Sequence, residues 1–272
     1  MRPHWTLDDI PWDRFDRSKV DPEILRAVKA ASLVERNADD YVAYLEQVFP
    51  DDAELLAAMR RWGVEENQHG EALAQWCRLA DPEFDFAAAR ARFAAGFQLP
   101  QDVDASVRGS KAGELIARCI VETGTSSFYS AIRDATDEPV LKAVCNRVAG
   151  DEFRHYKLFY DHYRRYQQHD RLSLPAKLKV ALGRIVETSD DELPMAYYCA
   201  NALTEPYDRR RHGAAYASRA YGLYRQGHVQ RAVGMVCKAC DIDPQGRIAG
   251  WAAKLFWFVL RRRTRQLERI AA

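Results

Sequence analysis

The feature that most constrains the fold of this chain is a Glu-x-x-His motif that occurs twice, at Glu66 and His69 and again at Glu152 and His155. Residues three apart lie on one face of an α-helix, so each motif predicts a helix that carries a carboxylate and an imidazole side by side. One copy of so short a motif is common by chance. Two copies in one chain indicate two helices with the same chemical face.

Two further glutamates stand upstream of the motifs at almost equal distances. Glu35 lies 31 residues before Glu66, and Glu122 lies 30 residues before Glu152. Each interval has a proline-containing turn signal near its middle, so each predicts two antiparallel helices joined by a tight connection. With a helical rise of about 1.5 Å per residue, each upstream glutamate is then level with its motif.

Helical patterning dominates the chain, and no convincing strand alternation is present. The expected long helices cover residues 22–48, 52–79, 103–135 and 139–168. A connection over 80–101 separates the two hairpins, with a short helix expected over 84–93, and one such long crossover is what a ferritin-like topology requires. The predicted fold is all-α: a ferritin-like four-helix bundle with an N-terminal extension over 1–170, and additional C-terminal helices over 171–272 packed on the bundle.

Two stretches of the C-terminal region have patterns of their own. Residues 216–244, with a turn expected at Gln226 and Gly227, resemble one tetratricopeptide-type unit. A single unit cannot bury its own apolar face, so a plain helical hairpin packed on the bundle is the favoured interpretation. The helix from Arg247 onward is apolar over 251–260 and basic afterwards. It fits either an anionic membrane surface or packing over the bundle, and packing is favoured.

Six side chains form the candidate metal site: Glu35, Glu66, His69, Glu122, Glu152 and His155. Ferritin-like di-iron and di-manganese bundles use one Glu from each of two helices and a Glu-x-x-His from each of the other two. Four ionised glutamates carry a charge of −4 and two neutral imidazoles add none, so two divalent cations neutralise the set. Without metal, these carboxylates would repel one another in a bundle core. The prediction is two iron ions, with manganese as the alternative at either position.

The residues around the motifs carry a narrower resemblance. Residues 65–70 read Glu-Glu-Asn-Gln-His-Gly, residues 151–155 read Asp-Glu-Phe-Arg-His, and residues 122–125 read Glu-Thr-Gly-Thr. These segments resemble the Glu-Glu-Asn-Arg-His-Gly, Asp-Glu-Lys-Arg-His and Glu-x-x-Thr motifs of the soluble acyl-carrier-protein desaturases. The resemblance covers about residues 30–165, and the departures at Gln68 and Phe153 bear on the substrate more than on metal binding.

Three residues near the ligands are candidate catalytic residues. A histidine that binds a metal normally donates its other ring N–H to a carboxylate or carbonyl, so Asp151 is expected to hold His69 across the bundle. Arg154 is expected to hold Asp151 by a charge-assisted bond, unless both face solvent. By its resemblance to the desaturase motif, Thr125 is expected beside the oxygen-binding face of the cluster, although a helical Thr often bonds its own i−4 carbonyl instead.

The resemblance implies an oxygen-activating di-iron oxidoreductase, of the desaturase or hydroxylase type, that acts on an apolar and carrier-bound acyl substrate. Its expected partners are an external electron donor such as ferredoxin and acyl carrier protein. Three alternatives stay open: a rubrerythrin-like peroxidase or iron-oxidising protein without an organic substrate, a non-catalytic interaction protein, and a ferritin-like hydroxylase of tRNA or a small metabolite. The lone Cys237-x-x-Cys240 does not predict a rubredoxin-type iron site.

Composition limits the partners and the cellular location that we expect. The formal net charge is +1, which gives no reason to expect a nucleic-acid partner. The six cysteines are scattered, and no charged-then-apolar leader is visible, so a reducing cytoplasm is the simplest location. No apolar run approaches the roughly 18 residues of a transmembrane helix. A homodimer is the expected oligomeric state.

Overall fold

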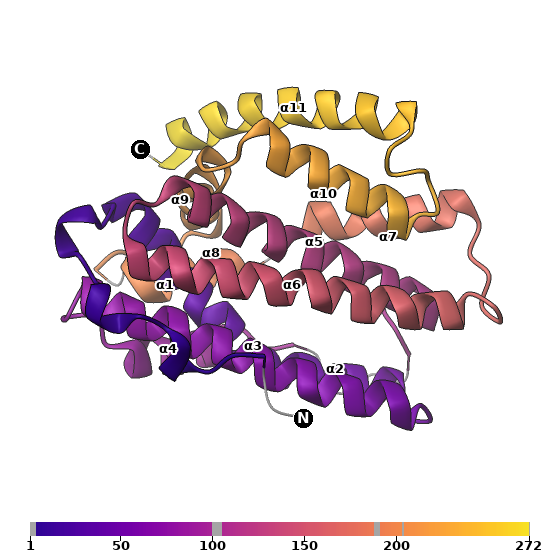
Figure 1. The fold of residues 1–272 in the computed structure, drawn as a ribbon, viewed down its shortest axis with the longest axis horizontal. Coiled ribbons are helices and arrows are strands. Elements are labelled where there is room, and N and C mark those ends of the chain that lie inside the picture. The colour runs from indigo at the N-terminus through magenta and orange to yellow at the C-terminus, as the bar shows by residue number, and fades with distance from the viewer. Residues whose placement is uncertain (1–3, 100–104, 188–190, 203, 272) are drawn as a thin grey trace.

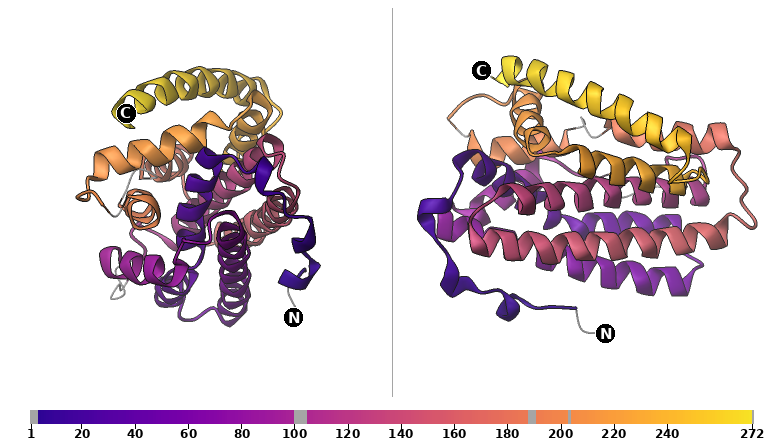
Figure 2. Two further views of the ribbon diagram at one scale, coloured as in Figure 1. Left: turned by 90° about the vertical axis from the view of Figure 1, so that its left-hand side faces the viewer. Right: turned by 45° about the horizontal axis from the view of Figure 1, so that its top comes forward.

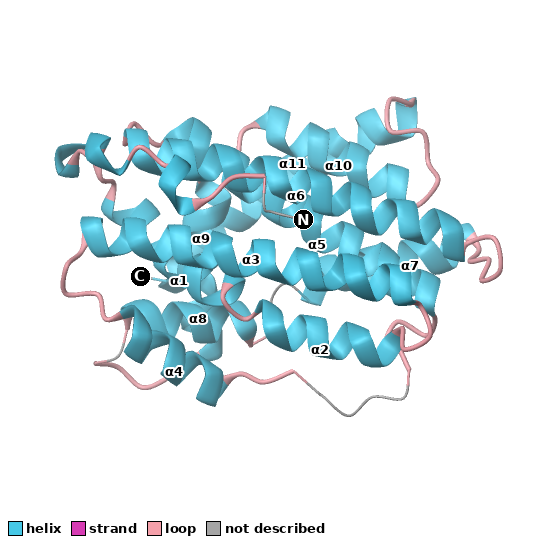
Figure 3. Ribbon diagram, turned by 60° about the horizontal axis from the view of Figure 1, so that its bottom comes forward, coloured by secondary structure: helices cyan, strands magenta, loops and turns pink. Residues whose placement is uncertain are grey.

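The computed structural model describes residues 4–99, 105–187, 191–202 and 204–271. Within these ranges every regular element is helical, which confirms the all-α class (Figure 3). The α-helices, in chain order, are α1 (Pro22–Glu35), α2 (Ala38–Val48), α3 (Ala53–Ala80), α4 (Phe86–Gly96), α5 (Lys111–Ala135), α6 (Pro139–Tyr166), α7 (Leu174–Glu187), α8 (Glu192–Asn201), α9 (Arg209–Gly222), α10 (Gln226–Ala239) and α11 (Arg247–Ala271).

Two long helical hairpins form the centre of the molecule (Figure 1). In one hairpin, α1 and α2 both pack against α3, and in the other α5 packs along α6. Contact between α3 and α6 joins the two hairpins. The chain passes from α3 to α5 by the predicted long connection, in which α4 is the short helix expected near 84–93.

Capping side chains set where the long helices begin. Asp21, Asp52, Ser110 and Glu138 each accept a hydrogen bond from a backbone N–H in the first turn of α1, α3, α5 and α6, respectively. The predicted start of the third helix at Val103 lies outside the described residues. Ser110 places the observed start at Lys111, and the short polar segment before it forms turns.

The prediction of one continuous helix over 22–48 is wrong in one respect. The observed helix is interrupted between Glu35 and Ala38. Gly70 on α3 faces this break. A Cβ at Gly70 would lie 2.5 Å from Cγ and 2.8 Å from the backbone nitrogen of Arg36. The absence of a side chain at Gly70 therefore lets the break approach α3, and Glu35 ends α1 beside that contact.

The apolar core is divided into two parts. One contains Trp76 and Leu73 and reaches α4, α8 and α9, and the other contains Met59 and Phe159 and lies between α2, α3, α5 and α6. On α3 and α6 the two parts are separated by the segments that carry the Glu-x-x-His motifs. The polar site thus sits in the middle of the bundle with an apolar layer on either side.

The C-terminal helices cover one side of the hairpins (Figure 2). Helix α7 packs on α5, and α8 packs on α1 and α4. The turn expected at 226–227 lies instead over 223–225, and α10 begins at Gln226. The hairpin predicted over 216–244 also needs correction, since α9 packs chiefly on α8 and α11, whereas α10 packs on α5 and α11. No helix in the described ranges has the length and hydropathy needed to cross a bilayer.

Candidate metal centre

The structure brings all six predicted ligands together. Glu35 comes from the end of α1, Glu122 from α5, and the two Glu-x-x-His motifs from α3 and α6. Each of the six side chains is buried, with Glu35 the most exposed at 7%. Burial of so many ionisable groups is costly unless they are paired or bind a metal. The cluster is therefore a candidate metal centre on physical grounds.

The donor atoms form two groups that overlap. The first contains Glu35, Glu66, His69 and Glu152, and the second contains Glu66, Glu122, Glu152 and His155. Within each group, one donor atom from every residue lies within 4.8 Å of the others. Each group offers three carboxylates and an imidazole, and could hold a metal ion. Glu66 and Glu152 belong to both groups, so the two groups share two carboxylates.

Both imidazoles are held by carboxylates outside the ligand set. Nε2 of His69 lies 2.9 Å from Oδ2 of Asp151, and Nε2 of His155 lies 2.8 Å from Oε2 of Glu65. An ionised carboxylate only accepts hydrogen bonds, so Nε2 carries the proton in each neutral ring and Nδ1 keeps its lone pair.

The two Nδ1 atoms point toward the centre of the cluster. Nδ1 of His69 lies 3.1 Å from Oε1 of Glu152, and Nδ1 of His155 lies 2.9 Å from Oε1 of Glu66. Neither Nδ1 atom has a hydrogen-bond partner of proper geometry within the described part of the chain, and the same is true of Oε1 of Glu122 and of Glu152. Buried polar atoms are rarely left without partners. These unpartnered donors are what a bound cation would satisfy, so the residues present fit a metal site.

The histidine supports are reciprocal. Asp151 stands next to Glu152 on α6 but binds the histidine of α3, and Glu65 stands next to Glu66 on α3 but binds the histidine of α6. The contact expected between Asp151 and His69 is present, and Arg154 forms an ion pair with the other oxygen of Asp151. The role of Glu65 was not predicted from the sequence. The signal was available, because an acidic residue precedes the Glu in both motifs.

Trp5 covers the side of the cluster where His69 lies. Its indole N–H donates to Oδ2 of Asp151 at 2.7 Å, and its ring stacks on His69 with 6.1 Å between centroids and 5° between planes. The side-chain amide of Gln68 donates to the Trp5 carbonyl at 3.0 Å. The N-terminal extension thus closes one side of the site, and Gln68, a departure from the desaturase motif, helps to hold it there.

Two hydroxyl groups contact the candidate ligands. Tyr129 Oη donates to Oε1 of Glu35, and Thr125 Oγ1 donates to Oε2 of Glu152 at 2.6 Å. Thr125 Oγ1 also lies 3.4 Å from the carbonyl oxygen of Val121, the local partner expected of a helical Thr. The shorter contact places the Thr125 hydroxyl at the cluster. Tyr129 was not among the site residues predicted from the sequence.

Electrostatics within the cluster favour cation binding. Burial raises the pKa of Glu35 and of Glu122, and neighbouring carboxylates raise it further. Burial alone would lower the pKa of His69, but the carboxylates of Glu152 and Glu66 beside its Nδ1 raise it to about 10. The pKa of His155 is raised for the same reason, by Glu152, Glu65 and Glu66. In the metal-free protein the cluster therefore holds protons on the two histidines and on nearby carboxylates. Bound cations would displace those protons.

Neither a protein-family model nor a curated protein sequence matches the chain. Function therefore has to be inferred from the donor set and its geometry.

Proposed function

We propose that this chain is an oxygen-activating di-iron oxidoreductase, of the desaturase or hydroxylase type, that acts on an apolar acyl substrate. The single observation that carries the proposal is the pair of overlapping donor groups, which share Glu66 and Glu152 in the bundle interior. This is the donor set of the ferritin-like di-iron and di-manganese bundles.

The chemistry of the donors supports iron as the metal. Carboxylate oxygens and imidazole nitrogens suit iron, and sites that combine them with open positions are typical of non-haem iron oxygenases. The same donors accommodate manganese, which is the alternative at either position. Two reduced iron ions held by these residues would supply the activation of O₂ needed to oxidise an unactivated C–H bond.

The surrounding residues have distinct tasks in such a reaction. Asp151 and Glu65 fix the tautomer and orientation of the two imidazoles. The apolar layers on both sides of the site exclude bulk water from it. Thr125 holds a hydroxyl proton beside Glu152, where it can be delivered to a reacting oxygen. Tyr129 holds Glu35 in place through its hydroxyl.

The surface near Thr125 supports the approach of a substrate from the α5 side. Gly124 is exposed, and a Cβ built on it would meet no atom within 4 Å. Thr125 itself is half-buried, so its hydroxyl lies between the open surface and the buried carboxylates. A carrier-bound acyl chain is the substrate class that the resemblance to the desaturases implies.

Electrons have to come from a separate protein in this proposal. All six cysteines are buried and unpaired, so they do not form an exposed redox site in the described chain. An external donor such as ferredoxin is the partner we propose, with acyl carrier protein as the partner that presents the substrate.

The decisive experiment supplies iron, O₂, ferredoxin with its reductase and a panel of acyl substrates bound to carrier protein or coenzyme A. Mass spectrometry of the acyl chains should show loss of two hydrogens or gain of one oxygen, and Glu152→Ala should abolish both. Glu71→Ala, an exposed change on α3, is the matched control and should keep the activity. Rapid peroxide turnover without any acyl product would instead support a rubrerythrin-like peroxidase, and absence of O₂ consumption beyond iron oxidation would support an iron-oxidising protein.

A further inference from the structure

The outer face of α11 is unusually apolar for a helix on the surface. Ile248, Trp251 and Phe258 are 68%, 69% and 64% exposed, and Leu255 and Val259 are about half exposed. Successive members of this set are one, three or four residues apart, which places all of them on one side of the helix. The opposite side is buried against the molecule through Ala249, Ala253, Leu260 and Leu267. Figure 2 shows α11 as the outermost layer in both views.

The same helix carries a concentrated positive charge. It has seven basic residues and one acidic residue, a formal net charge of +6, whereas the whole chain has +1 and the remainder therefore −5. Five arginines follow the apolar stretch directly, at positions 261, 262, 263, 265 and 269. None of these five forms an ion pair with an acidic side chain within the described residues.

Arginine clusters elsewhere behave differently. Arg164 pairs with Asp241, Arg165 with Asp52, and Arg211 with Glu205. These three arginines are paired with acidic side chains of the same chain. The arginines of α11 keep their charge available for a partner outside it.

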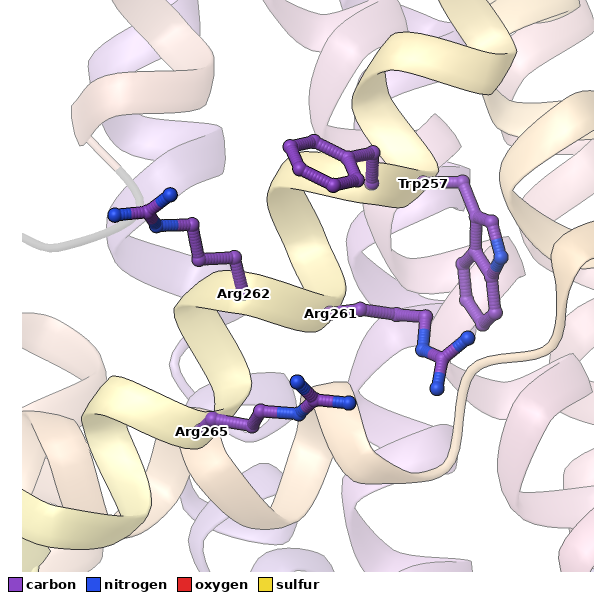
Figure 4. A pocket seen from close by; sticks show the side chains of 5 residues that line it. Trp257, Arg261, Arg262 and Arg265 are labelled. Carbon is purple, nitrogen blue, oxygen red and sulfur yellow. The ribbon is translucent and has the colours of Figure 1, made fainter.

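Arginine and aromatic side chains meet in a surface pocket on α11. The pocket has a volume of about 490 Å³ and is lined by Trp257, Phe258, Arg261, Arg262 and Arg265. Figure 4 shows the three guanidinium groups around this part of the helix, with the Trp257 ring beside Arg261. Guanidinium groups bind phosphate oxygens through paired N–H donors, and the rings offer apolar contact next to them. This combination suits the phosphate and upper acyl region of a lipid.

We propose that the outer face of α11 binds the surface of a membrane that contains anionic lipids. An amphipathic helix with aromatic and aliphatic side chains on one face lies in the interface between headgroups and acyl chains. Each arginine near an anionic surface adds about 1 kcal/mol of attraction. Because α11 is a packed outer helix of the folded protein, the whole molecule would dock through it. This inference is independent of the metal centre and goes beyond the proposed activity.

Charge favours a lipid surface over a second copy of this chain. In an antiparallel pair of α11 helices centred on the apolar stripe, Arg261 and Arg262 of one copy would come close to Arg247 of the other. In a parallel pair, each arginine cluster would face its equivalent. Both arrangements bring like charges together, whereas an anionic membrane complements the apolar stripe and the arginines at once.

The test is flotation of the full-length protein with vesicles of phosphatidylcholine alone or mixed with phosphatidylglycerol, at low and high salt. The apolar variant is Trp251→Ser/Phe258→Ser and the charge variant is Arg262→Gln/Arg265→Gln. The matched control is Leu182→Ser/Arg171→Gln, which changes an exposed apolar residue of α7 and an exposed arginine outside α11. Circular dichroism checks that each variant is folded.

We expect the wild type and the control to float with the phosphatidylglycerol vesicles and to bind phosphatidylcholine much less. The charge variant should bind anionic vesicles about thirtyfold more weakly, and the apolar variant at least about tenfold more weakly. Equal binding to both vesicle types, or no flotation at all, overturns the proposal. So does self-association in sedimentation that only the apolar variant abolishes, or binding of acidic carrier protein by α11 without vesicle binding.

Discussion

Nε2 of His155 lies 2.8 Å from Oε2 of Glu65, the residue that immediately precedes the candidate ligand Glu66 on the facing helix. The contact matches that of Asp151 with His69. Each histidine is therefore held by the acidic residue that precedes the candidate ligand Glu on the facing helix. Carboxylates that orient a metal-binding histidine commonly contribute 10- to 100-fold to metal affinity.

Glu65→Gln and Asp151→Asn should each therefore weaken metal binding by about 10- to 100-fold while leaving the fold intact. Titration of the metal-free protein with Co²⁺, followed by its visible absorption, measures the affinity. Glu71→Gln removes an exposed carboxylate from α3 and serves as the control. Wild-type affinity in both variants would show that these contacts do not position the imidazoles.

The overlap of the two donor groups predicts different stoichiometries for different ligand changes. Glu35 belongs only to the first group and Glu122 only to the second, whereas Glu66 belongs to both. Glu35→Ala and Glu122→Ala should each leave one ion bound per chain, and Glu66→Ala should weaken both. Metal analysis after gel filtration counts the ions. If all three variants lose the same amount of metal, the idea of two ions bridged by Glu66 fails.

Protonation of His69 predicts how the stability of the metal-free protein depends on pH. Its pKa is about 10 in the folded chain and 6.5 in the unfolded reference, because burial, which lowers the pKa, is outweighed by the nearby carboxylates of Glu152 and Glu66. Between these values the folded state holds a proton that the unfolded state has released, so the free energy of unfolding should fall as pH rises. Chemical denaturation from about pH 6.5 to about pH 10 measures the slope.

Metal-loaded protein is the control for this pH dependence, since Nδ1 of His69 then has no proton to lose. Its stability should change much less over the same range. Calorimetry of metal binding near pH 7 in buffers of different ionisation enthalpy should also detect released protons. Equal slopes with and without metal, together with no proton release, would contradict the proposed ligation by His69.

Replacing each of two glycines beside the candidate ligands by alanine should have different effects on the free energy of unfolding. Gly70→Ala places a methyl group 2.8 Å from the backbone nitrogen of Arg36, a contact that the break after Glu35 cannot relieve without moving. We expect a loss of about 1–3 kcal/mol in the free energy of unfolding and weaker metal binding through Glu35. Gly124→Ala meets no atom within 4 Å and should be neutral or stabilising by up to about 1 kcal/mol. Urea unfolding of both variants decides the matter, and equal effects would argue against the close approach at Gly70.

The sequence predicted the helical hairpins and the six candidate ligands because both depend on regular spacing. Residues three or four apart share a helical face, and residues about 30 apart across a turn lie level on the two helices of a hairpin, so spacing alone pairs Glu35 and Glu122 with their motifs. The reciprocal role of Glu65 follows from the same regularity. It becomes visible only when the acidic residue before Glu66 is compared with Asp151, the acidic residue before Glu152.

Features that depend on contacts between distant segments could not be predicted in this way. The break after Glu35 has no proline or glycine beside it, and Gly70 on another helix leaves room for it to approach α3. Trp5 stands 146 residues from its hydrogen-bond partner Asp151, in a segment with no helical periodicity. Local propensity carries no information about such pairs, which are set by packing of the whole chain.

The reciprocal support of the two histidines also bears on how such a chain could arise. Each hairpin carries an acidic residue, a Glu and a His in the same order, and each acidic residue serves the histidine of the other hairpin. Two identical hairpins related by a twofold axis would satisfy the same contacts, so the pattern is what duplication and fusion of a single-hairpin gene would leave. After such a fusion, equivalent positions in the two copies can acquire different residues. Gln68, which binds Trp5, and Arg154, which pairs with Asp151, occupy equivalent positions and already serve different neighbours.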